Sequence, residues 1–226
     1  CGDQVEIVRT QDGVIAVMSD GLGSGIKANI LATLTSKIAA TMLKKGEDLP
    51  EVLDTLAHSL PICKIRNIAY STFTIIYARQ NGDVYIADYE NPTAFYYNKK
   101  RKRISGVQGN ERIINGKKII ETEIHLHDGD CIIVTSDGVI HAGVGELLNY
   151  GWGWRHVAKY LEDICSDNNV MMISKLLIST CNDLYDGKPS DDATTMVVKM
   201  TTPQAINIFT GPPLLREMDE MVVREF

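Results

Sequence analysis

The chain has 226 residues, of which 44% are hydrophobic and 23% charged, a balance that supports a folded core and excludes a disordered chain. Its 29 acidic residues outnumber 23 basic ones, and the net charge of −6 disfavours a nonspecific nucleic-acid binder. No apolar run approaches the roughly 18 residues that a membrane-spanning helix needs. The five cysteines are scattered and odd in number, so we expect a soluble protein of a reducing cytoplasm without a disulfide framework or zinc ribbon. Residue 1 is Cys rather than Met, so we expect an excised piece of a longer polypeptide or a processed product.

The chain opens with a predicted β-hairpin. Residues 4–9 partly alternate polar and apolar side chains, Asp12-Gly13 marks a turn, and residues 14–18 are continuously apolar. If Gln11 and Asp12 form a two-residue loop, Asp3 lies opposite Asp20. Two carboxylates that face each other repel unless a cation lies between them.

Further helices and strands follow from the apolar pattern. Its spacing predicts helices between Ser24 and Gly46 and over residues 51–60, 154–165 and 171–184. Strands are predicted over residues 71–78, 84–88 and 94–98, which we expect to form a meander, and over 118–126, 131–135 and 194–200. Because tight turns join most strands and the helices come in pairs, we expect an α+β fold with largely antiparallel sheets and helices outside them.

Two Ser-Asp-Gly triplets set two carboxylates apart from the other acidic residues. Asp-Gly occurs five times, but only Asp20 and Asp137 follow a buried apolar strand directly. Asp191 begins a strand as Asp137 ends one, so these two share a sheet edge if their strands are antiparallel neighbours. With Asp3, four acids would then form an all-oxygen site for two Mg²⁺ or Mn²⁺ ions. The alternative is four turn aspartates that are solvated or cap helices.

Four segments together resemble the signature blocks of the type 2C metal-dependent protein Ser/Thr phosphatases, in the branch of stage II sporulation protein E. These segments are Gly2-Asp3, residues 19–25, Ser136-Asp137-Gly138 and residues 191–194. The resemblance implies an αββα sandwich of two largely antiparallel sheets flanked by helices, with the metals at one end. It also implies a phosphatase domain over residues 1–200, which leaves residues 201–226 as a linker and the start of a helix.

Each metal role is implied by this resemblance, position by position. Asp20 would bridge two Mn²⁺ or Mg²⁺ ions, with Asp3 and the Gly21 carbonyl on one ion and Asp137 and Asp191 on the other. These four aspartates would form the catalytic set, and a metal-bridging water would attack phosphorus without a phosphoenzyme. Asp192 matches a nonligand position. Leu22 stands where many relatives outside this branch carry a His that protonates the leaving group.

The resemblance therefore implies a metal-dependent protein Ser/Thr phosphatase of bacterial signalling, and by analogy a phosphorylated anti-sigma-factor antagonist as the substrate. One alternative is a catalytically silent relative that binds a phosphoprotein. Another is an enzyme that binds nucleotide at residues 21–25, although their glycine spacing matches neither the dinucleotide nor the P-loop motif.

Three other features have two interpretations each. His125 and His127 could form a metal pair or lie at the surface beside a turn. His141 could act as an acid near Asp137, or be structural or exposed. Trp152 and Trp154 could form a partner-binding patch or belong to the core.

Overall fold

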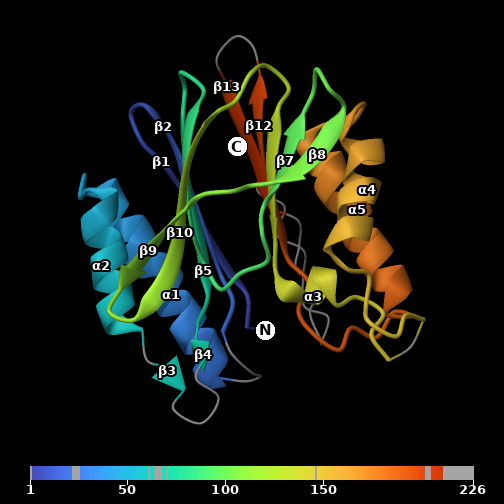
Figure 1. Ribbon diagram of the computed structural model, residues 1–226, viewed down its shortest axis with the longest axis horizontal. Helices are drawn as coiled ribbons and strands as arrows, with labels where there is room; N and C mark the ends of the chain where they lie inside the picture. The colour runs from blue at the N-terminus through green and yellow to red at the C-terminus, as the bar shows by residue number, and fades with distance from the viewer. Residues whose placement is uncertain are drawn as a thin grey trace. The chain divides into compact units, whose positions relative to one another are not determined.

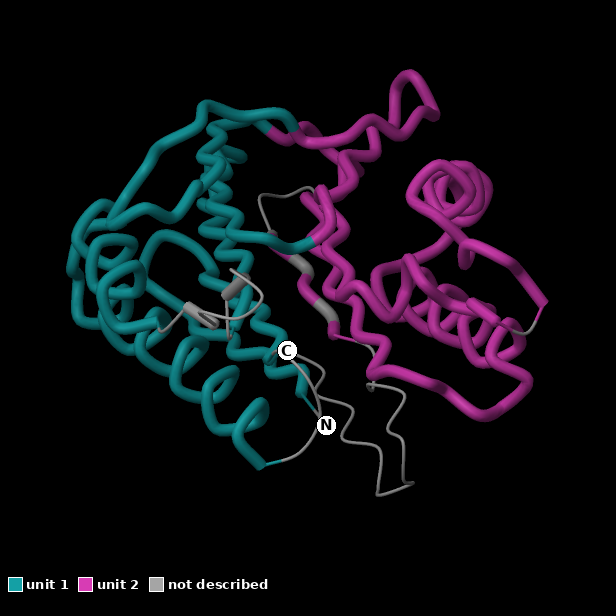
Figure 2. Tube along the Cα trace, turned by 60° about the horizontal axis from the view of Figure 1, so that its bottom comes forward, with its two compact units in different colours: residues 1–91, 108–125 teal, residues 92–107, 126–226 magenta. Residues whose placement is uncertain are grey.

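The computed structural model describes residues 2–21, 26–60, 62–63, 68–69, 71–145, 147–201 and 205–210. The chain divides into two compact units (Figure 2): unit 1 comprises residues 1–91 and 108–125, and unit 2 residues 92–107 and 126–226. Each unit contains one larger antiparallel sheet with helices beside it (Figure 1). This arrangement confirms the predicted α+β class with antiparallel sheets and flanking helices.

Unit 1 is built on a six-stranded sheet in the order β1-β2-β5-β6-β10-β9. Its strands are β1 (Gln4–Arg9), β2 (Gly13–Ser19), β5 (Phe73–Arg79), β6 (Asp83–Tyr89), β9 (Asn110–Ile114) and β10 (Lys117–His125). Helices α1 (Ile26–Lys44) and α2 (Leu49–Ser59) pack on one face of this sheet. A separate pair of short strands is formed by β3 (Ile62–Cys63) and β4 (Ile68–Ala69).

The apolar core of unit 1 lies between the sheet and these two helices. Ile15 and Val17 of β2 and Ile75 of β5 belong to it, together with Leu53 and Leu56 of α2, and all five are fully buried. Strand β2 is buried along its whole length, which is why its sequence is continuously apolar rather than alternating.

Unit 2 is built on a five-stranded sheet in the order β13-β12-β11-β7-β8. Its strands are β7 (Phe95–Asn98), β8 (Arg103–Gly106), β11 (Cys131–Thr135), β12 (Thr195–Thr201) and β13 (Ala205–Thr210). The helices of this unit are α3 (Asp137–Ile140), α4 (Trp154–Cys165) and α5 (Val170–Leu184). Its core joins Phe95 and Ile133 of the sheet to Val157, Leu161 and Leu177 of α4 and α5.

Strand β7 corrects the predicted meander. Strands β5 and β6 are neighbours as expected, but β7 pairs with β11 and β8 in the other sheet. The apolar pattern identified the strand, whereas its partner lies far away in the sequence. Strands β8 and β9 were not anticipated, because β8 alternates exposed and half-buried residues and β9 is exposed up to its last residue.

The sequence after residue 200 also differs from the expected linker. Residues Ala205–Thr210 form β13, which pairs antiparallel with β12. The start of a helix expected near the end of residues 201–226 falls outside the described residues. Ser24, the predicted start of α1, and Gly23 and Gly25 of the glycine-rich loop also fall outside them. The boundary of a phosphatase domain at residue 200 stays a prediction.

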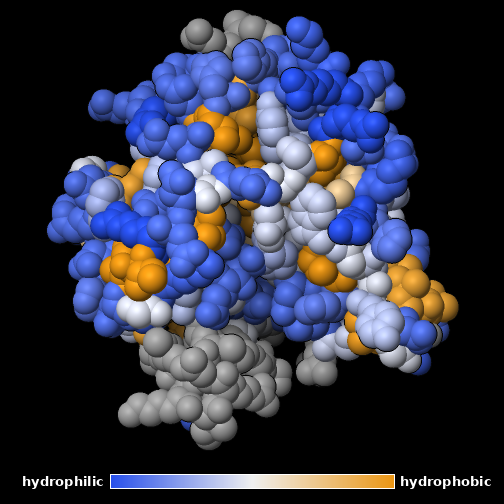
Figure 3. All heavy atoms as spheres, in the orientation of Figure 1, coloured by the Kyte–Doolittle hydropathy of each residue, from blue (hydrophilic) through white to orange (hydrophobic). Residues whose placement is uncertain are grey.

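The face of the protein in Figure 3 is largely polar. On the face in Figure 3, apolar side chains form separate patches among hydrophilic ones, and Ile26, Ile30 and Leu34 of α1 are among the exposed large apolar residues. These three residues are spaced by four and therefore lie along one side of α1. None of the helices in the described parts of the chain combines the length and the apolar character needed to cross a membrane.

The hairpin register follows the prediction from its turn. Gln4 pairs with Ser19 and Arg9 with Val14, and Thr10 N donates to Gly13 O over 2.9 Å at the turn. The two-residue loop therefore fixes the pairing of β1 with β2 over its full length.

The close approach at Gly13 generates a prediction about stability. A Cβ atom added at Gly13 would lie 2.1 Å from the Ala78 carbonyl oxygen and 2.9 Å from Arg79 Cα, so Gly13→Ala must displace β5 or the hairpin. We expect it to lower the free energy of unfolding by roughly 2 kcal/mol, measured by urea unfolding.

The matched control for this prediction is Gly106→Ala in β8. There a Cβ atom would meet only side-chain atoms of Thr93 and Trp154, the nearest at 3.2 Å. Since side chains move more easily than backbone, this variant should lose clearly less stability. Equal losses in the two variants would contradict the assignment of the cost to the backbone of β5.

Candidate functional site

Asp3 and Asp20 lie opposite each other at the open end of the β1–β2 hairpin. Gln4 pairs with Ser19, and Gly21 N donates to Gly2 O over 3.2 Å. Asp3 and Asp20 lie between these two residue pairs, so they form the intervening pair of the ladder. Pair types alternate along an antiparallel ladder, which makes theirs the non-hydrogen-bonded type with closer side chains. Asp3 is only 5% exposed. The predicted opposition of these two carboxylates is confirmed.

Hydroxyl groups anchor the strand end that carries Asp20. Ser19 Oγ donates to Thr72 O over 2.6 Å and lies 2.7 Å from Ser71 Oγ. Thr35 Oγ1 of α1 donates to the same Ser71 hydroxyl over 3.2 Å, and Thr72 N donates to Asp20 O over 2.8 Å. The backbone at Asp20 is thereby tied to the segment before β5.

In unit 2, one serine joins the segment after β11, which contains Asp137, to the segment before β12, which contains Asp191. Strand β12 begins only at Thr195, so Asp191 precedes the strand that it was expected to begin. Strands β11 and β12 are antiparallel neighbours, as the expected shared edge requires. Ser136 N donates to Thr194 O over 3.0 Å, and Ser136 Oγ accepts from Thr194 N over 2.9 Å and donates to Asp192 O over 3.2 Å. Asp137 and Asp191 therefore belong to the same end of this sheet.

The two Ser-Asp-Gly triplets form similar corners. In both, the serine hydroxyl bonds to the neighbouring segment. In both, the glycine allows a close backbone approach, since an added Cβ would lie 2.2 Å from Ala28 O at Gly21 and 2.1 Å from Asp192 O at Gly138. The aspartate between serine and glycine is thus held in a rigid corner. The sequence displays this repeat, but the role of each member becomes visible only in the structure.

The corner in unit 2 continues into a helix that the sequence analysis did not predict. Asp137 is the first residue of α3, and His141, which follows the helix, is exposed and donates its backbone N to Asp137 O over 2.8 Å. Buried Tyr185 donates its hydroxyl to Gly138 O over 2.7 Å. No sequence signal singled out Tyr185. The role of His141 as an acid stays a prediction.

Of the four predicted metal aspartates, Asp3 and Asp20 lie opposite each other in unit 1, and Asp137 and Asp191 lie at one end of the sheet in unit 2. Across the described residues, no three His, Cys, Asp or Glu side chains gather into a group that could hold a metal ion. The donor chemistry nevertheless fits Mg²⁺ or Mn²⁺, because four carboxylates and the Gly21 carbonyl supply only oxygen. Their assignment as metal ligands stays a prediction.

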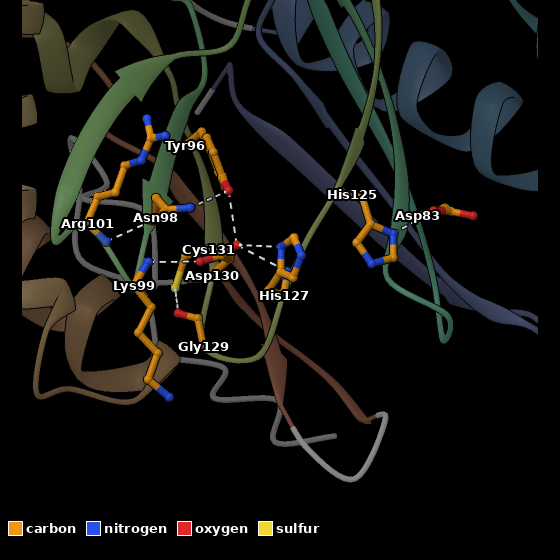
Figure 4. Close-up of polar contacts among 10 residues, drawn as sticks. All are labelled: Asp83, Tyr96, Asn98, Lys99, Arg101, His125, His127, Gly129, Asp130 and Cys131. Carbon is orange, nitrogen blue, oxygen red and sulfur yellow. Dashed lines mark hydrogen bonds and ion pairs between the residues drawn. The ribbon is translucent and has the colours of Figure 1, made fainter.

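The two histidines of the His-x-His sequence take separate acidic partners (Figure 4). His125 Nδ1 lies 2.8 Å from Asp83 Oδ1, and this contact is the largest influence that lowers the pKa of Asp83. His127 Nδ1 lies 3.6 Å from Asp130 Oδ2. Both imidazoles are more than half exposed. The surface interpretation is therefore the right one.

The two tryptophans contribute to the packing of unit 2. Trp154 stacks on Phe95 with ring centroids 4.7 Å apart and donates Nε1 to Thr93 O over 2.8 Å. Trp152 packs against Tyr160 at 5.3 Å. Both rings pack against the hydrophobic core of this unit, which supports the core interpretation over a partner-binding patch.

Strand β6 carries an acidic residue that the sequence analysis did not single out. Thr74 Oγ1 donates to Asp88 Oδ2 over 2.6 Å. Withdrawal from water raises the pKa of Asp88 from 3.8 to about 7, and this outweighs the opposing hydrogen bonds from Thr74 and the Asn91 backbone. Its cross-strand neighbours in unit 1 are Thr74 and Ile120, and neither carries a charge. Asp88 therefore titrates near neutral pH.

The family named Stage II sporulation protein E (SpoIIE) matches residues 10–201 of this chain. The chain belongs to the SpoIIE family. The matched range includes Asp20, Asp137 and Asp191, while Asp3 precedes it. No curated protein matches the chain. The resemblance stated from the sequence is confirmed.

Several solved structures share the fold of this chain. The RsbU and RsbW domains of a Mycobacterium tuberculosis protein give a TM-score of 0.73 at 16% identity, covering 89% of this chain and 56% of that chain. The PP2C phosphatase domain of SpoIIE from Bacillus subtilis, with a fragment of its regulatory domain, gives a TM-score of 0.71 at 21% identity. The match covers 89% of this chain and 58% of that chain. RsbX in complex with magnesium gives a TM-score of 0.60 at 17% identity, and the match covers 87% of this chain and 86% of that chain.

These likenesses show that the SpoIIE-family chain has the fold of a PP2C phosphatase domain. It spans less than two thirds of the length of the first two chains. The enzyme class expected from the sequence, a phosphoprotein phosphatase, is the class of the SpoIIE domain in this comparison.

The raised pKa of Asp88 predicts a pH-dependent change in stability. Between its ordinary pKa of 3.8 and its folded-state pKa of about 7, the unfolded chain loses the proton first, so stability falls as pH rises. Asp88→Asn removes this loss because an amide does not ionise. In metal-free protein we expect a gain of roughly 4 kcal/mol in the free energy of unfolding at about pH 8, and none below about pH 4.

Urea unfolding at both pH values measures this difference. The wild type at the same pH is the reference for the variant. A gain of equal size at the two pH values would show that ionisation of Asp88 is not its cause.

Proposed function

We propose that this SpoIIE-family chain is a metal-dependent protein serine/threonine phosphatase. In this proposal Asp3, Asp20, Gly21, Asp137 and Asp191 hold two Mn²⁺ or Mg²⁺ ions. The pair of Ser-Asp-Gly corners carries the proposal, because each corner fixes an aspartate at the end of a buried strand. The magnesium in the similar RsbX structure supports the choice of a hard divalent ion.

The chain's own residues would supply ligands and their orientation. When bound, two such ions would activate water for attack on a phosphate ester and neutralise charge on the phosphoryl oxygens. Asp3 and Asp20 face each other, and an interposed cation would relieve their repulsion. Ser19 and Ser136 would keep the corners rigid. Because Leu22 stands at the place of the acidic His of other relatives, the proton for the leaving group would come from water or another residue.

We infer a phosphoprotein substrate in bacterial signalling, and within that class a phosphorylated anti-sigma-factor antagonist. Membership of the SpoIIE family and the likeness to RsbU and RsbX domains support this class. A cytoplasmic location fits the described thiols of Cys131, Cys165 and Cys181, which are buried and not joined in disulfides.

Phosphate release tests the proposed function. We expect hydrolysis of a phosphoserine peptide and of p-nitrophenyl phosphate only with millimolar Mn²⁺. Asp20→Asn keeps the side-chain volume but removes the charge, so it should reduce turnover by at least about 100-fold. Circular dichroism of the variant confirms that the fold is retained.

The matched control is Asp186→Asn, which changes another Asp-Gly aspartate in an exposed turn after α5. It should keep the activity of the wild type. Release of phosphate that needs no metal and survives in Asp20→Asn would refute the site. No release with any metal would favour the catalytically silent relative.

A further inference from the structure

A continuous series of hydrogen bonds begins at the backbone of Asp20 in unit 1. Thr72 N donates to Asp20 O over 2.8 Å, and Asp20 N donates to Thr72 Oγ1 over 3.3 Å. Thr72 therefore holds both polar groups of the Asp20 backbone. Its hydroxyl in turn donates to Asn91 Oδ1, which links the corner to the residue that follows β6.

Asn91 extends this series to an acidic end. Its Nδ2 donates to Thr74 Oγ1 over 2.9 Å, and Thr74 Oγ1 donates to Asp88 Oδ2 over 2.6 Å. The side chains of Thr72, Asn91 and Thr74 all donate in the direction of Asp88. Hydrogen bonds that run in one direction polarise one another, so this arrangement is stiffer than separate bonds.

Two apolar side chains lie beside this polar series. On the same face of the sheet, Met18 pairs with Thr74 and Ile120 pairs with Asp88. Polar groups in such a position cost free energy, and an acid whose pKa is raised to about 7 costs more than an apolar residue would. A stability argument alone would favour apolar side chains at these positions. A role in holding Asp20 in position explains why polar side chains occupy these positions.

We propose that Asn91, anchored by Thr74 and Asp88, is a positioning residue that fixes the backbone of Asp20 for metal binding through Thr72. This inference rests on the proposed function, in which Asp20 is a metal ligand. Asn91 itself would touch neither metal nor substrate. Removing an outer group that orients a metal ligand typically lowers metal affinity by about 10–100-fold.

Two variants interrupt the series while leaving Asp20 and Thr72 in place. Thr74→Val keeps the branched shape but loses the hydroxyl that joins Asn91 to Asp88. Asn91→Ala removes the link to both threonines at a half-buried position outside the strands. We expect the Kd for Mn²⁺, measured by isothermal titration calorimetry on metal-free protein, to rise about 10-fold in each.

Thr122→Val is the matched control. Thr122 lies on the same face of the same sheet as Asp88, since it pairs with Ile86 of β6. Its hydroxyl donates to Gln108 O over 2.9 Å and takes no part in the series that reaches Asp20. This variant should keep the Kd of the wild type within about twofold.

The melting temperature of the metal-free protein separates positioning from simple structural support. A purely structural role would lower the melting temperature in both variants with no change in the Kd for Mn²⁺, and that result overturns the inference. If Thr74→Val does not fold, Asn91→Ala decides by the same comparison. A wild type that binds no more Mn²⁺ than Asp20→Asn would refute the proposed function and this inference together. If the wild type binds Mn²⁺ and both variants keep its Kd, only this inference is refuted.

Discussion

The register of β1 against β2 is the constraint on which the candidate site depends. The two-residue loop before Gly13 determines that Asp3 stands opposite Asp20. A slip by one residue would move every side chain of one strand to the other face of the sheet. The buried run of β2 and the hydroxyl contacts of Ser19 oppose such a slip, so core packing and site geometry are maintained by the same pairing.

Elements with a strong local signal could be predicted from the sequence. The bounds of α4 (Trp154–Cys165) follow directly from its apolar spacing, and the hairpin register follows from Asp12-Gly13. Strand pairing over long distances could not be read in this way. The apolar residues of β7 fit either sheet, and β9 has an exposed, charged sequence that resembles a loop.

The candidate site also contains some residues that could be predicted from the sequence and others that could not. Asp20 and Asp137 could be singled out because Ser-Asp-Gly after an apolar run is a local pattern, and Asp3 followed from the hairpin register. Resemblance to the family implied a role for all four aspartates. Thr72, Asn91 and Tyr185 carry no such pattern: Asn91 precedes a proline and looks like an ordinary turn residue. Their contacts with the corners arise from tertiary structure, where residues distant in sequence become neighbours.

The division of the chain into alternating segments has a consequence for its synthesis. Unit 1 uses residues 1–91 and then 108–125, with a segment of unit 2 between them. When only the first segment has left the ribosome, β6 is an unpaired edge, because its neighbour β10 is still missing. Exposed edges invite pairing with other chains. The nascent protein thus passes through a stage of aggregation risk that ends only when β10 closes against β6.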